Sequence, residues 1–193
     1  MADISPSKTA LLLMDFQNAI VGMVGGEAPA LLERAARARA SAKFAGVAVM
    51  HVRVAFGDAD YAAISPRNKG FSALAGRHFI TEGSEAAEIH AALKPAADEE
   101  IFTKKRVGAF STTNLGERLK ARGIDTLVLT GIATSGVVLS TLRDAADRDF
   151  SLLVISDCCA DMDGEVHRVL TEKVFPRQAD VIGLEDFLRT LAV

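Results

Sequence analysis

The stretch TLVLTGIATSGVVLSTLRDAADRDF, residues 126–150, changes its hydrophobic period part-way along, and this change predicts the fold class. Residues 126–132 form a continuous apolar run of strand length, whereas residues 135–148 have the spacing of an amphipathic helix. Small residues make the turn between them. Such a turn presents free backbone N–H groups at the start of a helix, where proteins often bind an anion or carry a nucleophile.

The same alternation of apolar runs and amphipathic segments continues on both sides of this stretch. Continuous apolar strands that alternate with helices indicate a parallel sheet covered on both faces. We therefore expect a three-layer α/β/α fold with a six-stranded, Rossmann-like parallel sheet, in one domain of residues 1–193. The further predicted strands are residues 9–15, 47–54, 100–104, 151–157 and 179–183, and the further predicted helices lie within residues 28–46, 84–93, 112–122, 164–173 and 184–191.

Residues 55–99 interrupt the alternation. They contain several glycines and the sequence Ser65-Pro66-Arg67-Asn68, and only residues 84–93 have the pattern of a helix. A segment of this length with little regular structure is uncommon within a domain and is usually functional. We expect it to form a lid or a contact with another subunit.

Composition and charge restrict the possible partners. A chain of 193 residues can bury a sizeable core, and its net charge of −3, with no dominant cluster of Lys and Arg, argues against binding to nucleic acid. No apolar run approaches the ~20 residues that a membrane-spanning helix needs. The first residues, MADISPSKTALLLMD, lack the basic region and cleavage site of a signal peptide. We expect a cytoplasmic protein without a membrane partner.

The cysteines and histidines do not predict a metal site or another cofactor. Cys158 and Cys159 are adjacent, and a disulfide between neighbouring residues is strained, so two buried cytoplasmic thiols are the simpler interpretation. A less favoured alternative makes one of them a nucleophile. None of the histidines has the sequence spacing of a metal-binding pair; they are His51, His78, His90 and His167.

Polar residues at the ends of the predicted strands are the candidate site, because open parallel sheets bind ligands beyond the carboxyl ends of their strands. The candidates are Asp15, Arg53, Lys104, Asp157 and the turn Ala133-Thr134-Ser135-Gly136. Burial at a strand end raises the pKa of Asp15, and a nearby Lys104 would lower it. The alternative interpretations are a structural ion pair for Asp15 and Lys104, and helix capping for Thr134 and Ser135.

Four further residues have two possible roles. Phe16, Phe71, Arg106 and Phe110 lie close in sequence to these candidates or to the irregular segment, so they can line a pocket. For the three aromatic residues, packing in the core is the favoured alternative.

Five segments together resemble the isochorismatase-like hydrolase superfamily, also called cysteine hydrolases. The matching segments, in this order, are TALLLMDFQN at residues 9–18, HVRVAF at 51–56, IFTKKRVGAFSTTNL at 101–115, LVLTGIATSGVVLSTLRDAADRDF at 127–150 and VISDCCADMD at 154–163. Each is weak alone, but their order and spacing are specific. The resemblance implies the same α/β/α fold, a small-molecule substrate and a homo-oligomer, either a dimer or a tetramer.

The resemblance also implies the site residues. The family's catalytic triad is Asp, Lys and Cys, which correspond to Asp15, Lys104 and position 137, where this chain has valine. Lys105 is the fallback for the lysine, although strand alternation turns it away. A cis peptide bond is expected at Ile132–Ala133. The residues implied for substrate binding are Phe16, Gln17, Arg53, Phe110, Ala133, Thr134, Ser135 and Gly136.

Val137 changes the implied mechanism. Valine cannot form a thioester, so the acyl-enzyme route of nicotinamidases and carbamoyl-amide hydrolases is closed, and the nicotinamidase metal ligands are absent after the second predicted strand. Isochorismatases proper cleave a vinyl ether and need a protonated carboxyl group instead of a nucleophile. We expect Asp15 to be this acid and Lys104 to bind a small anionic substrate or water. The chain lacks the Tyr-Ala-His turn of those enzymes. The alternative is a catalytically silent family member that binds a small molecule or serves as an assembly subunit.

Overall fold

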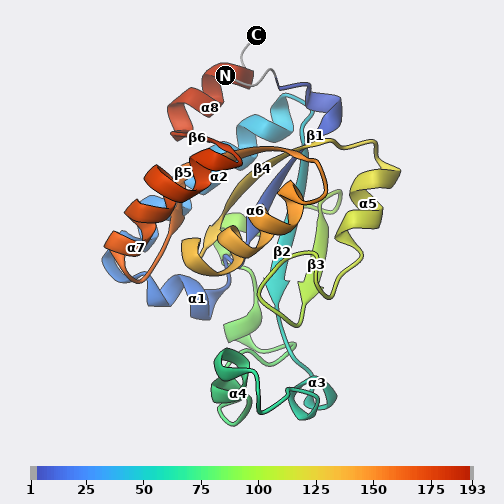
Figure 1. Ribbon diagram of the computed structural model, residues 1–193, viewed down its shortest axis with the longest axis vertical. Helices are drawn as coiled ribbons and strands as arrows, with labels where there is room; N and C mark the ends of the chain where they lie inside the picture. Colours follow the sequence, from blue (N-terminus) through green and yellow to red (C-terminus); the bar gives the residue numbers. More distant parts are fainter. Residues whose placement is uncertain (1–3, 192–193) are drawn as a thin grey trace.

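Six parallel strands form one sheet in the order β3-β2-β1-β4-β5-β6 in the computed structural model (Figure 1). The structure describes residues 4–191, apart from the side chains of residues 74 and 75. The predicted α/β fold with a six-stranded parallel sheet is confirmed. The strands are β1 (Thr9–Met14), β2 (Ala48–Val54), β3 (Glu100–Lys104), β4 (Thr126–Ile132), β5 (Ser151–Ala160) and β6 (Asp180–Ile182).

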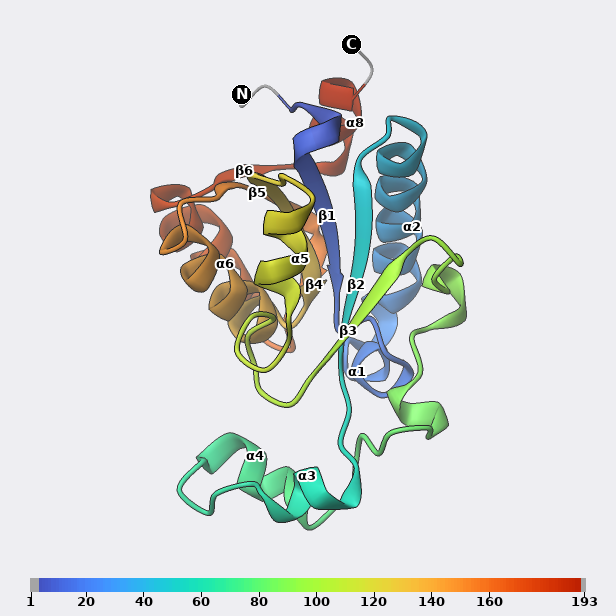
Figure 2. The same ribbon diagram turned by 90° about the vertical axis from the view of Figure 1, so that its right-hand side faces the viewer.

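Helices cover both faces of the sheet, as Figure 2 shows with the sheet seen nearly edge-on. Alternate residues of β1 face opposite layers, so Leu11 and Leu13 pack in one apolar cluster and Leu12 and Met14 in the other. The first cluster includes residues of α1 (Asn18–Met23), α2 (Ala28–Phe44) and α8 (Leu184–Leu191). The second includes residues of α5 (Leu115–Ala121) and α6 (Leu139–Ala146), and α7 (Gly164–Val169) leads into the same layer.

The strand order reverses between β1 and β4. The chain builds β2 and β3 on one side of β1, then returns to place β4 on its other side. All residues of β1 and β4 are buried, as expected for central strands covered on both faces. Open α/β sheets bind ligands at such a reversal, at the carboxyl ends of the strands. The carboxyl ends of β1 and β4 therefore mark the position of the candidate site.

Residues 57–82 form an arm that extends beyond the carboxyl edge of the sheet (Figures 1 and 2). The arm contains α3 (Asp58–Ala62) and α4 (Lys69–Ala75), two short helices that the sequence pattern did not predict. A small apolar cluster holds it together, with Phe56, Tyr61, Ile64 and Ile80 among its members. The expectation that residues 55–99 form a lid or a subunit contact stays a prediction.

The predicted helix at residues 84–93 is wrong. Two 3₁₀ turns occupy this segment, η3 (Glu85–Ala87) and η4 (Ala91–Leu93), with extended backbone between them. The N–H of Asn18 donates to the carbonyl of Glu88, and the N–H of His90 donates to the carbonyl of Phe16. These hydrogen bonds to a distant segment replace the helical ones.

Strand β5 is longer than the sequence predicts and includes both cysteines. In the pairing of β4 with β5, Leu129 lies beside Val154, but the register then shifts and Gly131 lies beside Cys159. This irregularity lets β5 continue to Ala160. Cys158 and Cys159 are free and buried, as predicted, and the structure adds that they lie in opposite layers.

The remaining elements of the described chain are three short 3₁₀ turns and two π-helical segments, η5 and η6. They are η1 (Pro6–Lys8), η2 (Gly25–Glu27), η5 (Thr134–Val138), η6 (Leu170–Val174) and η7 (Phe175–Arg177). Within residues 4–191, no helix has the length and apolar character that a membrane crossing requires.

Candidate active site

Asp15 and Lys104 form a buried ion pair at the carboxyl edge of the sheet. Asp15 follows β1 with a φ of 59°, and its N–H donates to the carbonyl of Val52 over 2.8 Å. Lys104 ends β3, and its side chain crosses the end of β2 to reach Asp15. The Nζ atom lies 2.8 Å from Oδ2 of Asp15, and the two side chains are 2% and 7% exposed. The predicted contact is confirmed, while its catalytic role stays a prediction.

The surroundings of Asp15 favour its protonated form. Burial raises the pKa of Asp15, and this effect outweighs the charge and hydrogen bond of Lys104, which lower it. The second oxygen, Oδ1, is buried and has no hydrogen-bond partner among the described residues. Buried polar atoms usually have a partner, so Oδ1 is the natural position for a proton or for a polar atom of a ligand.

Gly131 brings the turn after β4 close to Asp15. It pairs with Met14 at a φ of 152°, and a Cβ atom on Gly131 would lie 2.5 Å from the carbonyl oxygen of Met14. Only glycine permits this approach of β4 to β1. The peptide bond Ile132–Ala133 is cis, at the position that the resemblance implied.

Val137 lies in η5, directly after this turn. It is 2% exposed and belongs to the same apolar cluster as Met14, which precedes Asp15, and Ala109, which follows Lys104. The three segments implied by the family triad therefore meet in one layer of the molecule. In this chain the third position contributes a hydrophobic contact, since valine has no nucleophilic atom.

Thr134 and Ser135 do not cap a helix, contrary to the capping interpretation. Ala133 precedes η5 and makes no side-chain capping bond. The Thr134 hydroxyl lies 2.8 Å from Nδ1 of His167, and the Ser135 N–H donates to Oδ2 of Asp161 over 2.7 Å. Burial lowers the pKa of His167, although Asp161 opposes this effect, so a neutral imidazole is favoured. Sequence reasoning missed His167 and Asp161, because only the packing of α7 beside η5 brings them here.

Ala133 and Gly136 shape the turn through their backbone. The N–H of Gly136 donates to the carbonyl of Ala133 over 3.0 Å.

Two further candidates make their contacts away from Asp15. Asp157 accepts a hydrogen bond at Oδ1 from the N–H of Leu184 at the start of α8. Lys105 faces away from Asp15, as strand alternation predicted, and its Nζ lies 2.6 Å from Oδ2 of Asp60 on the arm.

The side chains of the two residues that follow Asp15 are held within the fold, and their implied binding roles stay predictions. Phe16 is 1% exposed and packs in the layer of α1 and α2. The Gln17 amide is fully used, because Nε2 donates to the carbonyls of Val54 and Ala87 and Oε1 accepts from the N–H of Val54. The structure thus directs both side chains into the fold.

None of the described hydrogen bonds, ion pairs or ring contacts of Arg53 and Phe110 involves Asp15 or Lys104. In the β2–β3 pairing, Val54 lies beside Lys104 and Arg53 lies beside Thr103. Side chains alternate along a strand, so Arg53 is on the face of the sheet opposite to Lys104. Its Nε donates a hydrogen bond to Oγ1 of Thr103. Phe110 packs in the core near Phe150, with the guanidinium of Arg148 over its ring. Packing, the favoured alternative for the aromatic residues, is therefore what the structure shows for Phe16 and Phe110.

The cysteines are poor candidates for a displaced nucleophile. Burial raises the pKa of the Cys159 thiol to about 12 and raises that of Cys158 further. Thiolate is the reactive form, and it is almost absent at neutral pH for such groups. Within the described residues, no cluster of three or more His, Cys, Asp or Glu side chains has an arrangement that could hold a metal ion.

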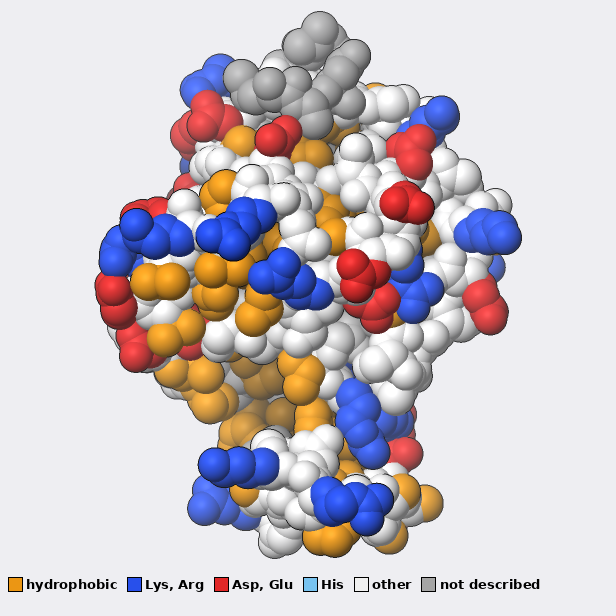
Figure 3. All heavy atoms as spheres, viewed as in Figure 1, with side chains coloured by type: hydrophobic (Ala, Val, Ile, Leu, Met, Phe, Trp, Pro, Cys, Tyr) orange, Lys and Arg blue, Asp and Glu red, His pale blue; other side chains and the backbone are white. Residues whose placement is uncertain are grey.

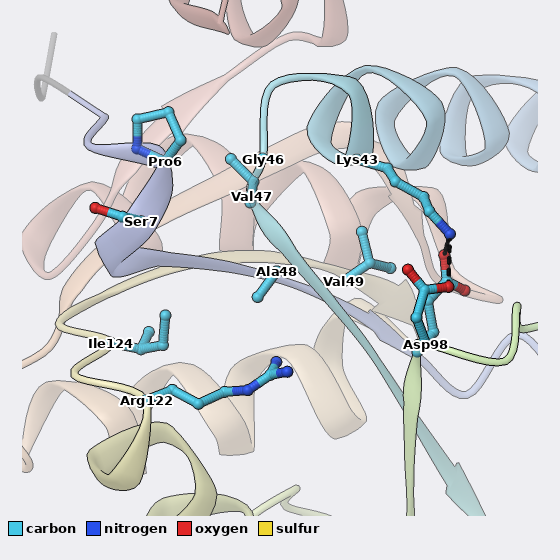
Figure 4. A pocket seen from close by; sticks show the side chains of 11 residues that line it. Pro6, Ser7, Lys43, Gly46, Val47, Ala48, Val49, Asp98, Arg122 and Ile124 are labelled. Carbon is cyan, nitrogen blue, oxygen red and sulfur yellow. Dashed lines mark hydrogen bonds and ion pairs between the residues drawn. The ribbon is translucent and has the colours of Figure 1, made fainter.

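Two cavities of the described chain have neither Asp15 nor Lys104 in their lining. One of about 510 Å³ is at the amino edge of the sheet, where Lys43 pairs with Asp98 over 2.8 Å (Figure 4). Another, of about 780 Å³, lies beside the edge strand β3 and is lined by Arg53, Glu88 and His90 among others. The ion pair itself is closed to solvent in the single chain, so a substrate needs movement of the covering segments.

Comparison with known proteins identifies the family. A sequence profile of the isochorismatase domain matches residues 9–186. The isochorismatase family protein YecD of Escherichia coli O157:H7 is 33% identical over 194 residues, which cover 99% of this chain and 100% of YecD.

The chain belongs to the isochorismatase family.

Two further proteins resemble the chain over most of its length. Maleamate amidohydrolase of Pseudomonas putida is 28% identical over 191 residues, covering 95% of this chain and 87% of that enzyme. The crystal structure of a cysteine hydrolase from Pseudomonas syringae pv. phaseolicola superposes with a TM-score of 0.88 at 21% identity, covering 99% of this chain and 95% of the other. The second likeness shows the shared fold, and the family as a whole is one of hydrolases.

Proposed function

We propose that this isochorismatase-family protein hydrolyses a small anionic metabolite through acid–base chemistry of Asp15 and Lys104, without a cysteine nucleophile. One observation carries the proposal. A carboxyl group with a raised pKa and one unpartnered oxygen lies against a buried ammonium group, at the reversal point of the sheet. Perturbed and buried titratable groups of this kind are typical of catalytic sites.

Asp15 would act as the proton donor. In an enol ether, the proton on Asp15 passes to the terminal carbon of the C=C bond, whose electron pair forms the new C–H bond and leaves an oxocarbenium ion. Water adds to the cationic carbon and returns a proton to Asp15. The hemiketal then breaks its C–O bond, and its hydroxyl proton passes to the departing alcohol. A positioned general acid contributes ~10²–10⁴-fold to the rate of such a reaction.

Lys104 would bind the negative charge of the substrate. A bound carboxylate offsets the charge of Lys104, which is one of the two effects that lower the pKa of Asp15. The substrate anion thus favours the protonated acid that the reaction needs. The similarity to maleamate amidohydrolase also supports an anionic substrate, because maleamate is a carboxylate. Maleamate is an amide as well, so small amides with a carboxylate are further candidate substrates.

The test is a substrate screen with a matched pair of variants. The parent protein is assayed against enol ethers and amides that carry a carboxylate, and every active compound is assayed with Asp15→Asn. We expect turnover to fall by at least ~10²-fold in this variant. Asp125→Asn is the control, because Asp125 is an exposed acid that pairs with Lys8 at the other end of the sheet. Normal turnover by Asp15→Asn would remove Asp15 from the mechanism.

A second function is favoured by Val137 and by the closed ion pair. A family member without a nucleophile and with a sealed site can bind a small anion or serve as an assembly subunit without turnover. Calorimetric titration of the parent and of Lys104→Met with the compounds of the screen distinguishes the two functions. A parent that is inert to all of them, yet binds one only when Lys104 is present, would establish the binding protein.

A further inference from the structure

His167 lies against the turn that follows β4 and bonds to Thr134. Its Nδ1 atom is 2.8 Å from Oγ1 of Thr134, and this is the only hydrogen bond of that hydroxyl group among the described residues. Thr134 is 0% exposed, whereas His167 is partly exposed. The N–H of Ser135 donates to Oδ2 of Asp161 over 2.7 Å. Two side chains from residues 161–167 therefore hold consecutive residues of the turn.

The burial of Thr134 decides which group donates in its contact with His167. A hydroxyl group has one hydrogen, and a neutral imidazole carries its hydrogen on either Nδ1 or Nε2. If Nδ1 donated, the hydroxyl hydrogen of Thr134 would be buried without an acceptor among the described residues, which is costly. If Thr134 donates, the ring hydrogen is on Nε2, which bonds to no described residue and is left for solvent. The contact therefore favours the Nε2–H tautomer.

Protonation of His167 would remove the acceptor that Thr134 uses. Imidazolium carries a hydrogen on both ring nitrogens, so Nδ1 could only donate. The hydroxyl oxygen of Thr134 could accept this bond, but its own hydrogen would then be buried without a partner. Thr134 begins η5, which also contains Val137, the position that corresponds to the family's nucleophile. The protonation state of His167 therefore affects the segment that carries Val137.

The charges around His167 leave it neutral near pH 7. Asp161, in the loop after β5, favours the protonated ring, but burial outweighs this effect and lowers the pKa of His167. η5, which packs against α7, contains no titratable residue. Figure 3 shows charged side chains of both signs over α7, and Arg168 pairs there with two glutamates. The charged residues of α7, of its N-cap and of η6 are Asp163, Glu165, Arg168, Glu172 and Lys173.

We propose that neutral His167 is a positioning residue of the candidate site and acts through Thr134 to hold residues 133–137 in the arrangement that the reaction needs. This role rests on the proposed function. Asp15 must be protonated in that reaction, so a fall in pH does not impair the acid. We expect an acidic limb in the pH dependence of kcat/KM that belongs to His167, since turnover is lost as the pH falls through the pKa of this ring, below 6.5.

The first experiment tests the hydrogen bond and needs no substrate. Nitrogen NMR of the parent, labelled with ¹⁵N-histidine, reports the tautomer and the pKa of His167, and His167→Asn assigns the signal. We expect the Nε2–H tautomer near neutral pH. Thr134→Val should raise the pKa of His167, because it removes a donor to the neutral ring, and Thr134→Ser should keep the parent value. An Nδ1–H tautomer, or a pKa that Thr134→Val lowers, would overturn the proposal.

The second experiment asks whether this bond holds the turn. In the Val137→Cys background, His167→Asn keeps an acceptor in place of Nδ1, whereas His167→Leu removes it. We expect iodoacetamide to label the introduced thiol several-fold faster with His167→Leu, because position 137 is only 2% exposed while the turn is held. Thr134→Val removes the same bond from the other side and serves if His167→Leu does not fold. Equal labelling rates with and without the acceptor would contradict a positioning role.

The third experiment uses any substrate that the screen identifies. His167→Leu should lower kcat by ~10-fold with little change in KM, the effect of one buried hydroxyl group left without a partner. His167→Asn should keep kcat and lose the acidic limb of the pH profile. His51→Gln, which removes another buried imidazole, is the control and should keep the limb.

Two activity results would remove His167 from the reaction, namely an acidic limb that persists in His167→Asn and one that His51→Gln abolishes. Normal turnover by Asp15→Asn has a different meaning. It would refute the proposed function, whereas the NMR and labelling experiments would still decide whether His167 holds the turn.

Discussion

The Nζ atom of Lys104 lies 2.8 Å from Oδ2 of Asp15, although 89 residues separate them and β2 lies between their strands. Both side chains are almost completely buried. A buried ion pair costs much of its Coulomb energy in desolvation, so this contact is weak evidence for a stabilising role. Its position at the sheet reversal, where open α/β sheets bind ligands, motivates the catalytic role proposed above, and the first prediction tests that role.

Lys104→Met should extend activity to higher pH for any substrate that the variant still turns over. The reaction proposed above needs protonated Asp15, and the cation of Lys104 lowers the pKa of that group. Removing the cation raises the pKa, so the protonated acid persists to higher pH. The measurement is kcat/KM against pH for variant and parent. An upper limb that stays in place, or moves to lower pH, contradicts the role of Asp15 as the acid.

Gly131→Ala should destabilise the protein by about 2 kcal/mol or more. An added Cβ would lie 2.5 Å from the carbonyl oxygen of Met14, and overpacking of this kind typically costs about 1–3 kcal/mol before backbone strain is added. Urea unfolding followed by circular dichroism measures the loss. Gly164→Ala is the control, because nothing lies within 4 Å of a Cβ there and the position begins α7. Equal stability of the two variants would show that β1 and β4 do not approach as described.

Val137→Cys should introduce a thiol that iodoacetamide labels faster than either native cysteine. Burial raises the pKa of Cys158 and Cys159, whereas a thiol at position 137 would lie directly after the turn of the candidate site, in the layer of Met14. Because Val137 is itself only 2% exposed, the reagent would reach the new thiol by the same movement that admits a substrate. Labelling at pH 7.5 is followed by mass spectrometry, with the parent as the control. We also expect alkylation of the parent to leave any activity unchanged. Faster labelling of Cys158 or Cys159 than of the new thiol would revive a displaced nucleophile.

His51→Gln should reduce the loss of stability that accompanies a fall in pH from about 7 to 5. His51 is 1% exposed, and burial lowers its pKa from 6.5, although its contact with Glu99 opposes this effect. The folded state therefore binds fewer protons than the unfolded state below pH 6.5. Stability is then lost as the pH falls through 6.5 toward the folded pKa, by up to about 1.4 kcal/mol per pH unit for one group.

The measurement is the free energy of unfolding at several pH values for the parent and His51→Gln. Glutamine can keep a hydrogen bond to Glu99, but it does not titrate. Val52→Ala is the control, because it disturbs the same strand without removing a titrating group and should keep the dependence of the parent. Parent and His51→Gln curves that run parallel would show that His51 does not titrate differently in the two states. His167, whose pKa burial also lowers, supplies part of the dependence that remains.

The positions of the strands could be predicted from the sequence because hydrophobic periodicity is a local property. The central strands appear as nearly continuous apolar runs, and Asp15 directly follows one of them, whereas Lys104 ends the short edge strand β3. The helix predicted at residues 84–93 failed for the opposite reason. Its backbone is held by hydrogen bonds to residues 16–18, more than 60 positions away, and a local pattern contains no information about them.

The sequence by itself determined the fold class and the family, and it singled out Asp15, Lys104 and Val137 as the candidate site. Tertiary structure decided which side chains meet. Gln17 is used within the fold, Arg53 lies on the opposite face of the sheet, and Thr134 bonds to His167. It also decided that Asp15 has a raised pKa despite Lys104. The physical reason is that periodicity fixes which face of an element is buried, whereas contacts and desolvation depend on the order in which distant strands and helices pack together.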